Sequence, residues 1–325
     1  MGTIDQEPCD FSRGRFRVLL CIYIPTKIEQ RSIDLSHSYS KQYDEMLVDA
    51  TSDATRKLFE VTDSYSNEIV AEGSKVDYRN INLNLDSALD RFYKTLFINL
   101  NIEDSYAHQQ GIKYRIPIKI AVGYEGIYVN YFRSDGSGEQ WSDIHKFSDV
   151  QGDFVIHFTL GEDVIITNKV TKEEDSGKRK DLANKYPNTC LKDEETFNKV
   201  KLQVINTLIQ SELEYYTKYS NEIAMQNGWE MNFNVPYWGN RAVKNIAFIA
   251  FYQGESFEGE NELHESYGYA TSELINKKDV YGYTLDNKKF YSDKKLSNAK
   301  DLTYFESTYE AAIHGYKPDP RYYYK

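Results

Sequence analysis

Apolar residues recur at helical spacing in three parts of the chain. The first stripe runs over residues 43–61, and the second over 85–100, where Asn84 or Asp86 can cap the helix. The third and longest stripe follows Asp193, which can also act as a cap. Steps of three and four residues place the apolar side chains on one face of each helix. We therefore predict three helices that each pack on a hydrophobic core.

Shorter apolar runs predict antiparallel strands. The predicted strands are residues 112–120, 127–132, 154–160, 164–167, 230–235 and 245–252. A glycine-containing turn joins the first pair and another joins the second pair, so two β-hairpins are predicted. Pro117 favours an edge strand because proline donates no hydrogen bond to a ladder. Residues 245–252 are apolar enough for the interior of a sheet. This pattern predicts an α+β fold, with helices packed on antiparallel sheets and a small Tyr-rich C-terminal module.

The same pattern divides the chain into five parts. They are an N-terminal segment (1–35), an α+β domain (36–170), a linker or surface loop (171–192), a long helix with strands (193–255), and a tyrosine-rich C-terminal module (256–325). The linker is predicted because its residues are charged and are interrupted by Gly177 and Pro187.

The N-terminal segment allows two interpretations. Residues 13–24, RGRFRVLLCIYI, place three arginines before an apolar run that Pro25 ends. A basic flank before an apolar run is typical of an export signal or a membrane anchor. The seven apolar residues of this run are far fewer than the roughly 20 that a membrane-spanning helix needs. A buried first β-strand accounts for the same residues, so a strand and an altered export or anchor segment both stay open.

Charge and composition narrow the classes of partner. The net charge is −11, and the basic run 178–180 directly follows acidic residues, so no basic face for nucleic acid is expected. The 28 tyrosines suit protein contacts because tyrosine offers a large contact area, although an AT-rich genome gives the same composition. Cys9, Cys21 and Cys190 form no CxxC pair and fix neither a disulfide nor a compartment.

No sequence motif indicates a catalytic or phosphate-binding site. The chain contains no phosphate-binding loop, no GxSxG elbow and no HExxH motif. Residues 157–160, His-Phe-Thr-Leu, resemble half of the active site of the two-histidine phosphoesterases. The second half would be residues 264–267, where Glu265 replaces an apolar residue.

Several potential metal ligands are close in sequence but follow no ligand spacing. They are Asp143, His145, His157, Glu162 and Asp163. A solvated surface is the expected arrangement for them. We therefore predict no catalytic, cofactor-binding or metal-binding residues and no enzyme activity.

The C-terminal tail resembles the small Ada-type zinc-binding module found at the end of many bacterial envelope and DNA-repair proteins. The matching parts are the Glu-Ala pair at 310–311 and Gly-Tyr-Lys-Pro at 315–318. The metal ligands of that module are replaced, since Tyr291 stands at its histidine and Asp319 and Tyr322 stand at its final cysteines. The resemblance implies a degenerate, metal-less module that is stabilised by Tyr and Phe packing.

The order of segments adds a second resemblance. An apolar start ending in IYIPTKIEQ, an early helix, hairpins and a strand ending in FYQG are similar to uncharacterised envelope proteins of low-GC Gram-positive bacteria, of Tad-like pilus or conjugation type. This resemblance implies a non-enzymatic, pilus-like structural or accessory subunit of a surface appendage or transfer machinery. It would lie in the cell envelope or on the extracellular face of the membrane, with membrane attachment left open.

The expected partners are other protein subunits or copies of the chain itself. Two alternatives stay open. One is a structural protein of a phage or mobile element, located in the cytoplasm or the virion. The other is an enzyme of unrecognised type.

Overall fold

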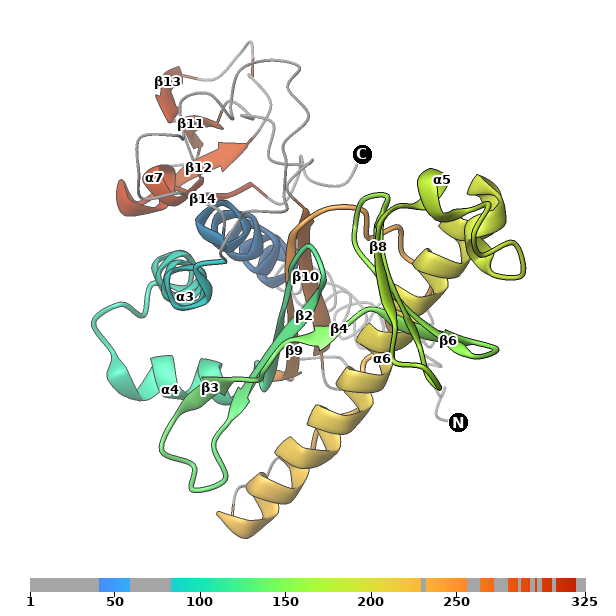
Figure 1. Cartoon of the computed structure of the whole chain (residues 1–325). Helices are drawn as coiled ribbons and strands as arrows, with labels where there is room; N and C mark the ends of the chain where they lie inside the picture. The colour runs from blue at the N-terminus through green and yellow to red at the C-terminus, as the bar shows by residue number, and fades with distance from the viewer. Residues whose placement is uncertain are drawn as a thin grey trace, which may run out of the picture.

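The computed structural model describes residues 41–58, 83–228, 232–255, 264–271, 280–285, 288–292, 296, 300–305 and 308–319. These residues form an α+β fold in which helices pack on antiparallel sheets and a small module follows at the C-terminus, as predicted (Figure 1). The N-terminal segment 1–35, with both of its interpretations and with Cys9 and Cys21, lies outside the described residues.

A six-stranded antiparallel sheet forms the centre of the molecule. Its strands are β1 (Ile118–Val122), β2 (Gly126–Phe132), β3 (Glu139–Trp141), β4 (His145–Lys146), β9 (Ala247–Glu255) and β10 (His264–Thr271). The order is β10-β9-β1-β2-β3, with β4 paired to β2. β1 and β2 form the predicted hairpin, and β9 lies between β1 and β10, as its apolar sequence predicts. The predicted parts 36–170 and 193–255 therefore contribute strands to one sheet.

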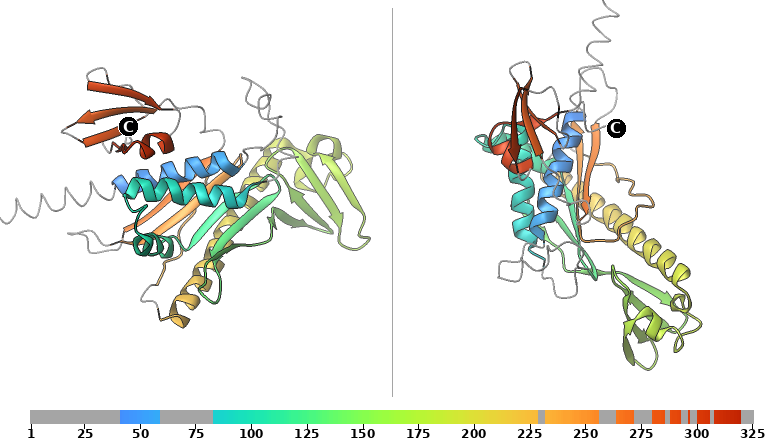
Figure 2. Two further views of the ribbon diagram at one scale, coloured as in Figure 1. Left: turned by 90° about the vertical axis from the view of Figure 1, so that its left-hand side faces the viewer. Right: turned by 90° about the horizontal axis from the view of Figure 1, so that it is seen from above.

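Helices cover both faces of this sheet. On one face, helix 41–58 lies beside α3 (Leu85–Leu100), as Figure 2 shows. The ring of Phe92 in α3 lies 5.3 Å from that of Phe248 in β9. Helix 41–58 approaches β10 closely at Gly268, where a Cβ atom would lie 2.7 Å from the Leu47 carbonyl oxygen. Only glycine fits this contact without displacing the helix.

The opposite face carries α6 (Glu194–Gln226). Tyr216 of α6 packs on Tyr131 of β2, with ring centroids 4.5 Å apart. The sheet therefore lies between two helical layers.

Two of the predicted helix caps are confirmed. The Asn84 side chain accepts a hydrogen bond from the Ser87 amide (3.2 Å), and that of Asp193 accepts one from the Thr196 amide (2.8 Å).

Two predicted strands differ in the structure. Residues 112–114 belong to the helix α4 (Tyr106–Tyr114), and β1 begins only at Ile118. Pro117 stands just before a central strand, where its missing amide hydrogen removes no bond from the ladder. The described part of the predicted strand 230–235 is irregular, because side chains rather than a neighbouring strand bind its backbone.

A second sheet of four strands lies at the N-terminal end of α6. Its strands, in order, are β5 (Ser148–Gln151), β6 (Phe154–Phe158), β7 (Asp163–Asn168) and β8 (Glu174–Lys178). β6 and β7 form the second predicted hairpin. The predicted linker 171–192 is instead structured, since it contains β8, α5 (Arg179–Leu182) and the 3-10 helix η2 (Cys190–Lys192). β8 is an edge strand, most of whose charged residues are exposed to solvent, so its composition is that of a loop. This composition explains why the sequence predicts a linker or surface loop here.

The C-terminal module forms a third sheet. Its elements are β11 (Val280–Leu285), β12 (Lys288–Ser292), β13 (Lys300–Phe305), α7 (Thr308–Ile313) and β14 (Lys317–Pro318), with strand order β13-β11-β12-β14. Its small core consists of Val280, Tyr291, Phe305, Ala311 and Tyr316. β10 precedes this module in the chain and belongs to the central sheet, so the module begins later than the predicted boundary at residue 256.

Buried carboxylates lie where the module meets helix 41–58. The Tyr291 hydroxyl donates a hydrogen bond to Asp49, and Tyr283 donates one to Asp319. Glu45 is 3% exposed, and neither of its side-chain oxygens has a hydrogen-bond partner in the described structure. Burial, followed by the negative charges of Asp49 and Asp319, raises the pKa of Glu45 to about 8.

Glu45 therefore predicts a pH-dependent stability. The pKa of Glu45 in the folded state lies above the ordinary 4.5. The contribution of Glu45 to the free energy of unfolding is therefore fully present below pH 4.5 and is lost as the pH rises through about 8. Glu45→Gln removes the charge. We expect the variant to unfold like the wild type near pH 4 and to be more stable by roughly 2–4 kcal/mol at pH 8–9. Urea unfolding across this range measures the difference, with exposed Asp90→Asn as control. The same difference in the free energy of unfolding at every pH contradicts the raised pKa of Glu45.

Candidate functional site

The length of α6 exposes its ends. Its 33 residues span about 50 Å. The strands that it crosses, β1 and β2, have 5 and 7 residues and span only about 17–24 Å. The helix therefore extends beyond the sheet, and its C-terminal end projects from the body at the bottom of Figure 1.

The two ends of α6 are covered differently. At the N-terminal end, Phe197 packs on Phe158 of the second sheet with ring centroids 5.7 Å apart. Lys201 donates a hydrogen bond to the carbonyl oxygen of Gly161 (2.6 Å). The C-terminal half is covered on one side by the irregular segment 232–238 and leaves another side open to solvent.

Side-chain amides hold the segment 232–238 in place. The Asn221 side chain accepts a hydrogen bond from the Phe233 amide (2.7 Å) and donates one to the Phe233 carbonyl (2.9 Å). Gln253 does the same with the Asn234 amide (2.8 Å) and carbonyl (2.7 Å). Gln210 accepts from the Trp238 amide (2.9 Å) and donates to the Pro236 carbonyl (3.4 Å). Each amide supplies one donor and one acceptor, as a neighbouring strand would. The segment is therefore fixed along α6 without joining a sheet.

A groove of about 880 Å³ lies between α6 and this segment. It is lined by Glu214, Thr217, Lys218, Asn221, Glu222, Met225, Asn232 and Val235. The Thr217 hydroxyl is buried in the lining and has no hydrogen-bond partner among the described residues. A buried hydroxyl without a partner is destabilising.

Large apolar side chains are exposed on the C-terminal half of α6 and on the segment 232–238. Tyr215 is 62% exposed, Met225 74% and Tyr237 83%, and Val235 is also exposed. We call Tyr215, Lys218, Glu222 and Met225, with the flanking Val235 and Tyr237, the α6 surface. Exposed tyrosine, methionine and valine side chains along a helix and its flanking segment are typical of a protein-binding surface. The α6 surface is the candidate functional site.

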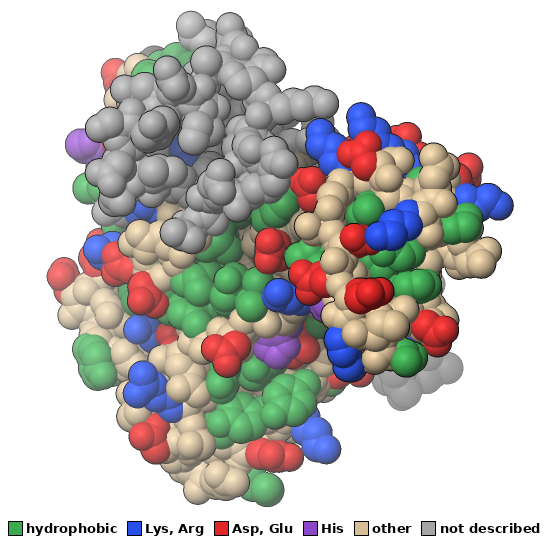
Figure 3. Space-filling model, viewed as in Figure 1, with side chains coloured by type: hydrophobic (Ala, Val, Ile, Leu, Met, Phe, Trp, Pro, Cys, Tyr) green, Lys and Arg blue, Asp and Glu red, His purple; other side chains and the backbone are tan. Residues whose placement is uncertain are grey.

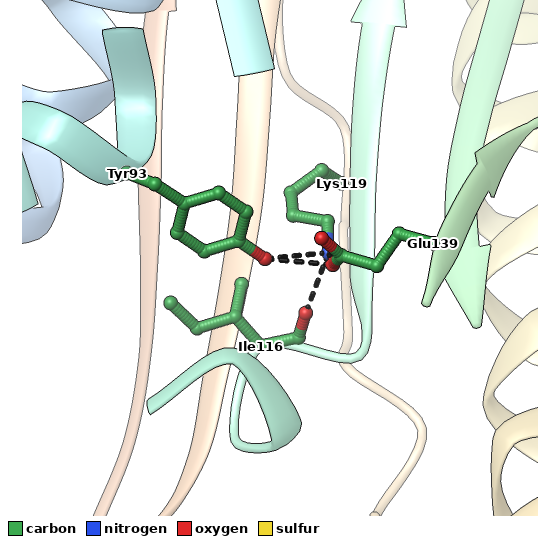
Figure 4. A network of polar contacts seen from close by, with 4 residues as sticks. All are labelled: Tyr93, Ile116, Lys119 and Glu139. Atoms are coloured by element: carbon green, nitrogen blue, oxygen red, sulfur yellow. Dashed lines mark hydrogen bonds and ion pairs between the residues drawn. The ribbon is translucent and has the colours of Figure 1, made fainter. Parts of the chain in front are cut away.

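A second candidate is a buried ion pair in the central sheet (Figure 4). Lys119 of β1 is fully buried and forms an ion pair with Glu139 of β3. It also donates to the Ile116 carbonyl and to the Tyr93 hydroxyl, both at 3.0 Å. The Tyr93 hydroxyl in turn donates to Glu139 (2.7 Å). Burial lowers the pKa of Lys119, and burial together with the Glu139 charge raises the pKa of Tyr93.

This network is satisfied by the protein itself. The three ammonium hydrogens of Lys119 have three acceptors. Tyr93 and Glu139 form part of the wall of a cavity of about 700 Å³ beside α3. Hydrophobic side chains also gather beside α3 on the face that Figure 3 shows. Since the network joins β1, β3 and α3, it holds an edge strand and a helix to the sheet.

The two histidine motifs lie in different sheets. His157 is in β6 of the second sheet, and residues 264–267 are in β10 of the central sheet. The Nδ1 atom of His157 lies 2.7 Å from the Ser148 hydroxyl, and burial with the nearby Lys146 lowers the pKa of His157. The structure therefore does not place these motifs on neighbouring strands, as a two-histidine active site requires.

Two of the other potential metal ligands have separate partners. His145 lies 3.0 Å from Glu212, and Asp163 accepts a hydrogen bond from Tyr124 (2.7 Å). Within the described ranges, no group of three or more His, Cys, Asp or Glu residues could hold a metal ion. Cys190 is buried, and burial raises the pKa of its thiol.

Comparisons with known proteins gave no match. No protein-family model, no curated protein and no solved structure matches the chain. None of the helices that the structure describes is both long enough and apolar enough to cross a membrane.

The Lys119 network predicts a large effect on stability. Lys119→Met leaves the Glu139 charge without its cation, and we expect a loss of roughly 3–5 kcal/mol in the free energy of unfolding. Lys119→Met/Glu139→Leu removes both charges and should recover at least half of that loss. The matched control is Lys94→Met, which breaks the exposed Lys94–Asp90 pair and should change stability by less than about 0.5 kcal/mol. Equal effects of Lys119→Met and Lys94→Met in urea unfolding contradict this role.

Proposed function

We propose that the protein is a non-enzymatic structural or accessory subunit that binds other protein subunits through the α6 surface. The observation that carries this proposal is the exposed C-terminal half of α6, where Tyr215 and Met225 are in solvent and Met225 lines a groove. Tyr237, in the segment that flanks α6, is also exposed. Exposed large apolar side chains are unfavourable for a free protein, and covering them with a partner removes their apolar area from water.

The chemistry of the surface favours a protein partner. Tyrosine and methionine are enriched in protein interfaces because they provide large or adaptable contact areas. The groove between α6 and the segment 232–238 offers a recess that side chains of an incoming chain can fill. An incoming chain can therefore cover the exposed apolar side chains.

The proposed cellular location of this subunit rests on the sequence. The segment order resembles envelope proteins of Tad-like pilus or conjugation type, so we place the subunit in a bacterial surface appendage or transfer machinery, in the cell envelope. A structural protein of a phage or mobile element would use the same α6 surface but would be found in particles. The cell fraction that contains the bound protein separates these two settings.

Site-specific crosslinking in the native host tests the proposal. Tyr237 is replaced by the photo-crosslinking residue p-benzoylphenylalanine, and Tyr106 of α4, which is 75% exposed, is replaced in the matched control. On irradiation we expect discrete adducts from position 237, in the envelope fraction, and none from position 106. Mass spectrometry identifies the captured chain, which should be a structural subunit of an appendage or a second copy. Equal adducts at both positions, or none at position 237, contradict the proposal.

A further inference from the structure

The exposed side of α6 carries four residues at a regular spacing. Tyr215, Lys218, Glu222 and Met225 follow one another at steps of three, four and three residues, and all four are exposed. This spacing is that of a coiled-coil seam and places the four side chains in one row along the helix. They face away from the buried residues of α6, such as Leu213 and Ile223, that pack on the body.

The row is symmetric about position 220. Lys218 and Glu222 each lie two positions from it, and Tyr215 and Met225 each lie five positions from it. If a second α6 runs antiparallel across the row, Lys218 meets Glu222 of the second copy and Tyr215 meets its Met225. Each pairing then occurs twice, as in any twofold-symmetric interface.

We infer that a second copy of this chain binds at the α6 surface, with the two α6 helices antiparallel. The inference rests on the proposed function and names the partner. The antiparallel arrangement pairs opposite charges and places a methionine sulfur beside an aromatic ring, both of which are favourable contacts. A parallel arrangement would set Lys218 against Lys218 and Glu222 against Glu222, which is repulsive.

The surroundings of the row leave room for this partner. Lys218, Glu222 and Met225 line one wall of the 880 Å³ groove, and Asn232 and Val235 line the other. Side chains of the second helix can enter the groove beside the row. The C-terminal end of α6 projects from the body, so a second helix can lie along it (Figure 1).

The size of the contact predicts its strength. The row from Tyr215 to Met225 covers ten residue steps, or about 15 Å of helix. Such a contact is smaller than a standard interface of about 800 Å² per partner. We therefore expect weak, concentration-dependent dimerisation, which suits a contact that is repeated within a larger assembly.

Charge reversal on the full chain tests this pairing. Lys218→Glu and Glu222→Lys each replace two attractive pairs with two repulsive ones, and each should weaken dimerisation by about tenfold in sedimentation velocity. The double variant Lys218→Glu/Glu222→Lys restores opposite charges and should return the dimer to within about twofold of the wild type. Lys199→Glu, at an exposed position near the start of α6, is the matched control and should have no effect.

The folding of each variant is checked by circular dichroism, and Met225→Glu gives a second disruption that alters the apolar pair. A wild-type chain that stays monomeric at every concentration overturns the inference, and so does a dimer that neither single reversal weakens. A monomer whose position 237 still crosslinks to a different structural subunit overturns the self-pairing alone. A monomer without any adduct at that position overturns the proposed function as well.

Discussion

The mismatch in length between α6 and the central sheet is the constraint from which the architecture follows. A helix of 33 residues is about twice as long as the strands that it crosses, so both of its ends must leave the sheet. The second sheet covers the N-terminal end, where Phe158 meets Phe197. Among the described residues, the segment 232–238 covers the C-terminal half, and the three side-chain amides that hold it leave one side of the helix in solvent. The exposed row of residues on α6 is a consequence of this arrangement.

Two buried polar contacts connect other elements of the molecule. The Lys119–Glu139 pair, with Tyr93, joins the centre of the sheet to its edge and to α3. The Asp49–Tyr291 bond joins helix 41–58 to the C-terminal module. The first contact pairs opposite charges, and Lys119 has three acceptors in it. The second lies beside Glu45, a carboxyl group that has no hydrogen-bond partner in the described structure. The sheet is therefore expected to be insensitive to mild changes in pH, while the module contact responds to them.

Elements with a strong periodic pattern could be predicted from the sequence, and those defined by long-range pairing could not. The caps at Asn84 and Asp193 and both hairpins are local signals, and the structure contains them. β8 was missed because its stability comes from pairing with β7 rather than from its own polar residues. The Lys119 network joins residues from three separate elements, so no spacing in the sequence indicates it. The row on α6 has a readable spacing from Tyr215 to Met225, but only the structure shows that this side of the helix is exposed.

The central claim is that the C-terminal half of α6 is an interface that lacks its partner in the single chain. Hydrogen–deuterium exchange of the full chain, measured by mass spectrometry at low and high protein concentration, tests this claim directly. The account predicts that peptides covering residues 214–226 and 232–238 exchange more slowly at high concentration, while peptides from the Lys119 strand β1 do not change. Exchange that is independent of concentration in residues 214–226, and as slow there as in β1, would contradict the account.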